Sequence, residues 1–145
     1  MSNASFDEKQ GSSAAAFKHI VVVDQINGIH EVTFRNVSPE ALKELVDYQS
    51  ILIKMVPEDA VIRQLHDYRV GLPPIGAAMR EIRKLVALPQ FANRHYRIAL
   101  LYPRRQMALM HPLSTLFGMA QIRNIKTNAF AEQNYDAAVA WLLKG

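Results

Sequence analysis

The chain has 145 residues, half of them hydrophobic, and a modest net charge of +4. This length is enough to bury one well-packed apolar core, so we expect a single domain. Because the chain holds no cysteine, disulfides, thiol catalysis and thiolate metal sites are excluded. No apolar run approaches the length of a membrane span, and the N-terminal residues lack the layout of a signal peptide. We therefore expect a cytoplasmic protein without a membrane span.

Positive charge is concentrated in the middle of the chain. Residues 62–126 carry eleven basic residues, nine of them arginine, and only two acidic ones. Arginine suits bidentate contact with phosphate or carboxylate groups. Two interpretations stay open: the arginines coat the outer faces of helices, or they meet an anionic partner. Nucleic acid is the least favoured partner, because the arginines are spread over several expected elements and no basic-aromatic RNA motif is present.

The N-terminal part of the chain predicts a tail followed by a hairpin. Residues 1–16 are small and polar without any period, which indicates a disordered tail before a single domain at 17–145. Residues 17–24 and 29–35 have the length and composition of strands. Asn27-Gly28 joins them, and both residues tolerate the positive φ that a tight hairpin turn requires.

The rest of the chain alternates helical and strand patterns. Ser38 can cap a free backbone N–H and Pro39 fits the first helical position, so a helix begins there, and Pro57 ends it. The apolar run 96–102 predicts a buried central strand. The other expected elements are a strand at 61–65, a loop at 71–74, a helix from 75 that Pro89 closes, a helix over about 107–120, a strand at 121–127 and a helix from about 132 onward.

The predicted element order is β-β-α-β-α-β-α-β-α. Strand–helix–strand units pair their strands in parallel through right-handed crossovers, whereas the opening hairpin adds an antiparallel strand. We therefore predict an α/β fold with a single-layer mixed sheet, an antiparallel N-terminal hairpin followed by parallel strands, on which the helices pack.

This order resembles that of the STAS-like, SpoIIAA-like proteins of bacteria, which are relatives of anti-sigma-factor antagonists and of STAS/SEC14-type domains. Leu65-His66-Asp67 at a strand end and the closing Phe130, Ala138 and Trp141-Leu142 carry the resemblance, which spans about residues 17–145. It implies a regulatory domain that switches partners through a phosphorylated serine after the strand ending in Asp. The corresponding stretch, 67–76, contains no serine or threonine, so that phosphorylation does not carry over.

Common catalytic and metal-binding motifs are missing from the sequence. No two histidines stand four residues apart, as a zincin-type site requires. A Gly-x-Ser-x-Gly elbow and the glycine-rich phosphate loops are absent as well. We therefore expect no metal, no cofactor and no enzymatic activity.

A candidate binding site follows from the expected topology. Ligands of open α/β sheets bind at the carboxyl ends of the parallel strands, which here are 66–69, 103–106 and 127–130. If the strands 61–65 and 96–102 are neighbours, several basic side chains converge there, and the following helix turns its N–H groups the same way. The candidate binding residues are His66, Asp67, Tyr68, Arg69, Arg104 and Arg105. The alternative is that the arginines only solubilise a loop edge.

Two functions are compatible with these patterns. The first is a non-enzymatic regulatory or protein-interaction domain of the STAS-like type, whose partner is another protein or a second copy in a homodimer. The second is a carrier or sensor of a small apolar or anionic ligand, bound between the 66–74 loop and the 107–119 helix. Tyr68, Tyr102 and Phe117 then either line this pocket or belong to the core.

Overall fold

Five strands form one mixed sheet in the computed structural model, which describes residues 17–109 and 124–144. The strands β1 (Ile20–Asp24) and β2 (Ile29–Phe34) form the antiparallel hairpin. The next three, β3 (Ile62–Asp67), β4 (Tyr96–Tyr102) and β5 (Ile125–Ala131), follow in parallel, each beside the strand that precedes it in sequence. The predicted α/β fold with a mixed sheet is confirmed.

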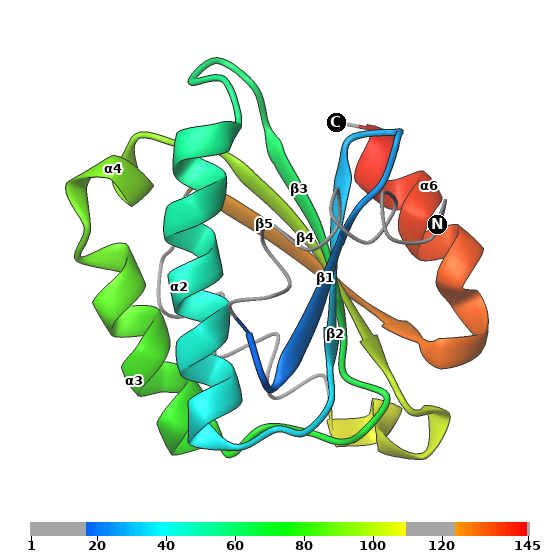
Figure 1. Cartoon of the computed structure of the whole chain (residues 1–145). Coiled ribbons are helices and arrows are strands. Elements are labelled where there is room, and N and C mark those ends of the chain that lie inside the picture. Colours follow the sequence, from blue (N-terminus) through cyan, green and yellow to red (C-terminus); the bar gives the residue numbers. More distant parts are fainter. Residues whose placement is uncertain (1–16, 110–123, 145) are drawn as a thin grey trace, which may run out of the picture.

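Helices cover both faces of this sheet (Figure 1). The helices α2 (Pro39–Met55) and α3 (Ile75–Val86) pack together on one face, and α6 (Tyr135–Lys144) packs on the other against β3, β4 and β5. Because the parallel strands are added in one direction, right-handed crossovers place their helices on the same face. Three short helices complete the described chain: α4 (Pro89–Ala92), and the 3₁₀ helices η1 (Arg104–Leu109) and η2 (Glu132–Asn134).

Local sequence signals account for the first elements. Gly28 adopts a φ of +88°, which the hairpin turn requires and which a side chain would strain. The Ser38 hydroxyl accepts a hydrogen bond from the N–H of Ala41 at 3.2 Å, so it caps α2 as expected. The N–H of Val56 donates to the carbonyl of Leu52 and closes the last turn of this helix.

Each face of the sheet has its own apolar core, because side chains alternate along a strand. The core beneath α2 and α3 includes Ile20, Val22, Val32, Phe34, Ile62, Tyr96 and Leu100, with Leu42, Tyr48 and Leu52 of α2. Beneath α6, four strand residues pack against two residues of the helix: Ile29, Leu65, Ala99 and Leu101 with Ala138 and Leu142.

Several arginines hold backbone carbonyls at helix ends. Arg94 is buried and donates to the carbonyls of Ile53, Val56 and Pro57 at 2.8, 3.0 and 2.8 Å, where α2 ends. Such carbonyls have no partner within the helix, and a cation is favoured there by the helix dipole.

The last turn of α6 is held by two further arginines. Arg63 of β3 donates to the carbonyl of Leu142, and Arg97 of β4 donates to that of Trp141. The Arg97 guanidinium also lies over the Trp141 ring at 4.0 Å. Some arginines from the basic middle of the chain therefore bind the carbonyl ends of helices. This role is neither the coating of helix faces nor the binding of an anionic partner, the two interpretations of the sequence.

Several element boundaries differ from prediction, and β1 begins at Ile20 instead of the predicted residue 17. Strand β3 runs two residues beyond 65, and β5 lies four residues further along the chain than its predicted strand. Pro89 does more than close a helix, because it opens α4. The tail predicted for 1–16 and residues 110–120 of the helix expected after Arg105 lie outside the described residues. Among the helices that the structure describes, none combines the length and the apolar character of a membrane span.

Candidate functional site

The structure divides the predicted site residues between the two faces of the sheet. His66 and Tyr68 point to the side of α2 and α3, where both line a pocket. Asp67 and Arg69 point to the opposite side and bind each other. The reason is the strand alternation: β3 continues through Asp67, so consecutive side chains face opposite ways. The six residues therefore belong to two separate features.

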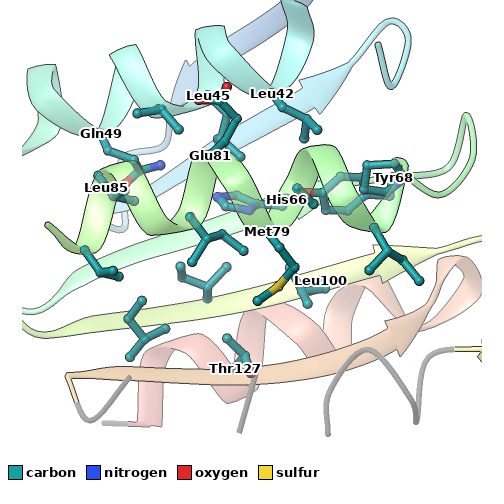
Figure 2. A pocket seen from close by; sticks show the side chains of 18 of the residues that line it. Leu42, Leu45, Gln49, His66, Tyr68, Met79, Glu81, Leu85, Leu100 and Thr127 are labelled. Carbon is teal, nitrogen blue, oxygen red and sulfur yellow. The ribbon is translucent and has the colours of Figure 1, made fainter. Parts of the chain in front are cut away.

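The first feature is an apolar pocket between the two helices and the sheet, which we call the α2–α3 pocket (Figure 2). Its volume is about 110 Å³. Figure 2 shows the ring of His66 between side chains of α2 above and the strand residues Leu100 and Thr127 below. The apolar wall includes Leu42, Leu45 and Val46 of α2, Ala78, Met79, Ile82 and Leu85 of α3, Ile98, Leu100 and Tyr102 of β4, and Tyr68 directly after β3.

Two buried polar side chains, Gln49 and His66, line this pocket, and Gln64 connects them. Gln49 of α2 and Gln64 of β3 exchange two amide hydrogen bonds, of 2.8 and 2.6 Å. Nε2 of His66 lies 2.7 Å from the Gln64 Oε1 atom, which also accepts from Gln49. All three residues are at most 5 % exposed. Buried polar groups must be paired, and this network pairs both amides while connecting α2 to the sheet.

His66 is neutral in this environment. Burial lowers the pKa of His66 to about 3, because the apolar surroundings penalise the imidazolium form. At neutral pH the ring therefore holds one proton and offers one donor and one acceptor nitrogen.

Two tyrosines close the pocket at the carboxyl end of the sheet. The rings of Phe34 and Tyr68 stack with centroids 4.4 Å apart, and Tyr68 stacks on Tyr102 at 5.2 Å. Burial raises the pKa of both tyrosines, so their hydroxyl groups stay protonated. Tyr68 and Tyr102 are thus both core residues and pocket walls, while Phe117 lies outside the described residues.

The second feature is an open recess at the carboxyl ends of β3 and β4, which we call the arginine recess. Its lining brings together the three arginines that the topology predicted, one proline and one acidic residue: Arg69, Arg104, Arg105, Pro103 and Glu132. Neighbouring β3 and β4 explain this convergence. Because β5 continues through Ala131, its carboxyl end is marked by Glu132 and not by residues 127–130.

A buried carboxylate sets the position of one of these arginines. Asp67 is 2 % exposed and accepts from Arg69 Nε at 2.8 Å and from Nη2 at 2.5 Å, and also from the Arg69 backbone N–H at 2.9 Å. The hydrogen-bonded Asp67 carboxylate raises the pKa of Arg69. Since Asp67 offsets the charge of Arg69, the anion-attracting charge of the recess rests on Arg104 and Arg105, both exposed, against Glu132.

Sequence reasoning missed several polar residues of these two features. The Gln49–Gln64 pair carries no motif, but Gln64 and His66 alternate with Leu65 in a strand, which places two polar side chains on one buried face. Tyr135 donates to Glu31 at 2.8 Å, and Gln25 donates to the same carboxylate, in a cluster on the Arg69 side of the sheet. No periodicity connects these distant positions.

Two further observations concern metal binding by the described residues and the relationship of the chain to known proteins. Across residues 17–109 and 124–144, no three His, Cys, Asp or Glu side chains are grouped as a metal site would need. Comparisons with protein-family models, with curated proteins and with solved structures give no match for this chain.

Proposed function

We propose that the protein is a non-catalytic binding domain whose α2–α3 pocket takes up a small, mainly apolar molecule. The observation that carries the proposal is the pocket itself, an apolar hollow whose lining includes the polar side chains of Gln49 and His66. Small-molecule sites have this character in general. An engineered apolar cavity of about 150 Å³ takes up benzene, so a pocket of about 110 Å³ suits a single-ring or similarly small molecule.

The arrangement of titratable groups supports binding over catalysis. His66 has the residue type of a general base, but Asp67 points to the other face of the sheet and cannot orient its ring. Instead the ring is oriented by Gln64, whose amide is itself paired with Gln49. Since the low pKa of His66 keeps its ring neutral across the physiological range, the group is suited to hydrogen bonding more than to proton transfer.

We also propose where the protein works and which family it is distantly related to. A chain of 145 residues without cysteine suits the cytoplasm, where disulfides are rare. We propose the STAS-like, SpoIIAA-like family as its origin, supported by the element order and by the sheet with an antiparallel hairpin before the parallel strands.

The test is uptake of fluorobenzene, followed by ¹⁹F NMR. We expect the wild-type protein to bind it, and Ala78→Leu to abolish binding, because Ala78 lines the pocket and the added methyl groups fill it. Ala140→Leu is the matched control, since Ala140 is exposed on α6. Absence of binding to the wild type, or equal binding by both variants, would refute the proposal. Native mass spectrometry of the protein purified from cells then shows whether a natural ligand is retained.

A second candidate function is interaction with an acidic protein partner, as the STAS-like resemblance implies. It is favoured by the arginine recess, whose Arg104 and Arg105 are exposed. Apolar side chains are exposed in the loop that follows Arg69 and at the start of α3: Val70 is 52 % and Ile75 51 % accessible. A charged recess near exposed apolar residues is typical of protein-interaction surfaces.

A labelled oligoglutamate peptide tests this second candidate by fluorescence anisotropy at low salt. We expect Arg104→Ala with Arg105→Ala to weaken binding, while Arg80→Ala with Arg83→Ala, on the exposed face of α3, leaves it unchanged. Equal loss in both double variants would indicate only unspecific attraction to positive charge.

A further inference from the structure

One nitrogen of His66 has no described hydrogen-bond partner although the residue is only 5 % exposed. Nε2 is engaged by Gln64, whereas no residue within 17–109 or 124–144 is hydrogen-bonded to Nδ1. The second nitrogen of an imidazole ring can form one further hydrogen bond, as a donor or as an acceptor according to the tautomer. His66 forms part of the wall of the α2–α3 pocket, where a bound molecule can supply the missing bond.

The atom of Gln64 that faces His66 determines which kind of group is missing. Gln64 Oε1 lies 2.7 Å from His66 Nε2, while Gln64 Nε2 donates to Gln49 Oε1. An oxygen can only accept, which requires that His66 Nε2 carries the proton. A neutral imidazole has one proton, and Nδ1 is therefore left with a lone pair. His66 thus contributes a hydrogen-bond acceptor to the lining of the pocket.

We propose that the molecule bound in the α2–α3 pocket carries a hydroxyl or N–H group that donates a hydrogen bond to Nδ1 of His66. This inference rests on the proposed function and narrows it to a chemical class: a small, neutral, mainly apolar molecule with one donor, such as a phenol or a short alcohol. Molecules of the same size that only accept hydrogen bonds leave Nδ1 unpaired and are disfavoured.

The other polar groups of the wall are less suited to select this class. Glu81 lines the pocket, but its carboxylate binds Lys84 at 3.1 Å on the outer face of α3. Thr127 also lines the pocket, and its hydroxyl can both donate and accept, so it does not discriminate donors from acceptors.

The test compares phenol with fluorobenzene, two rings of similar size of which only phenol has a donor. Fluorobenzene binding is titrated by ¹⁹F NMR, and phenol is measured by its displacement of fluorobenzene. The quantity is the ratio of the two dissociation constants. We expect His66→Phe to reduce the preference for phenol by about three- to tenfold, the equivalent of one hydrogen bond. His95→Phe is the matched control and leaves the ratio unchanged, because His95 is exposed and does not line the pocket.

The outcomes separate this inference from the proposed function. If neither compound binds the wild-type protein, the proposed function fails. If both bind and His66→Phe leaves their ratio unchanged, the pocket is a binding site but the inference is wrong. A second measurement holds even if His66→Phe does not fold: ¹⁵N NMR of the wild type should show the proton on Nε2 and a shift of Nδ1 when phenol is added. A proton on Nδ1 would overturn the inference.

Discussion

Replacement of Arg94 by methionine tests whether the arginines of this protein act as structural links. Arg94 lies between α4 and β4, is 4 % exposed, and binds three carbonyls at the end of α2. Arg94→Met keeps an apolar stem of similar length and removes only the guanidinium. The three carbonyls then lose their donor in a buried place.

The magnitude follows from those three bonds. A hydrogen bond from a charged group contributes about 1.5–3 kcal/mol, and water can replace part of what is lost at a helix end. We therefore expect Arg94→Met to lower the free energy of unfolding by about 3–5 kcal/mol. This is a large share of the about 5–15 kcal/mol of a typical domain. Within the described residues no carboxylate forms a salt bridge with Arg94, so added salt should change the loss little.

Urea unfolding followed by circular dichroism measures this loss, at low and at high salt. Arg83→Met is the control, because Arg83 is exposed on α3 and its replacement should cost no more than about 0.5 kcal/mol. A loss for Arg94→Met as small as that of the control would refute the structural role. A loss that disappears at high salt would show that an ion pair, and not the carbonyl bonds, holds this arginine.

Three further predictions concern His66, Arg97 and Ser38. The pKa of His66 is about 3 in the folded protein and about 6.5 in an unfolded chain, so between these pH values the unfolded state binds more protons. The free energy of unfolding should therefore fall with decreasing pH more steeply in the wild type than in His66→Phe, by up to about 1.4 kcal/mol per pH unit. Urea unfolding at about pH 7 and pH 5 measures this difference. Arg97→Met should cost about 1–3 kcal/mol and change the fluorescence of Trp141, because it removes both the carbonyl bond and the cation over the ring. Ser38→Ala should cost about 1 kcal/mol in thermal unfolding, through loss of the α2 cap.

Each of these predictions has a result that contradicts it. Parallel pH profiles for the wild type and His66→Phe would mean that the ring is not buried as a neutral group. Unchanged emission in Arg97→Met would place the guanidinium away from the indole. For Ser38, rescue by Thr or Asp but not by Val is the expected pattern, and equal stability of all four variants would exclude a capping role.

The sequence predicts the fold better than it predicts the site. Ser38-Pro39 marks the start of α2 to the residue, because the cap and the fixed φ of proline are local effects. Strand β5 is predicted four residues too early, since it lies at the edge of the sheet and alternates exposed with half-buried residues, so its apolar signal is weak.

The sequence predicts the site as one cluster because its apolar pattern ends the third strand at residue 65. Once the strand includes His66 and Asp67, its period of two sends them to opposite faces, which no motif reveals. The arginines that bind helix carbonyls were missed for a related reason. A backbone carbonyl has no sequence signature, so only the fold shows that Arg63, Arg94 and Arg97 have such partners.

The consecutive strand order has a consequence for how the chain gains its structure during synthesis. Each strand pairs with the one made just before it, so the sheet can grow from β1 onward as the ribosome proceeds. The α2 and α3 side is covered along the way, whereas Leu65, Ala99 and Leu101 have to wait for α6, which follows every strand. A nascent chain stalled before Tyr135 would therefore expose a complete apolar face, and this is the stage at which we expect chaperones to bind it.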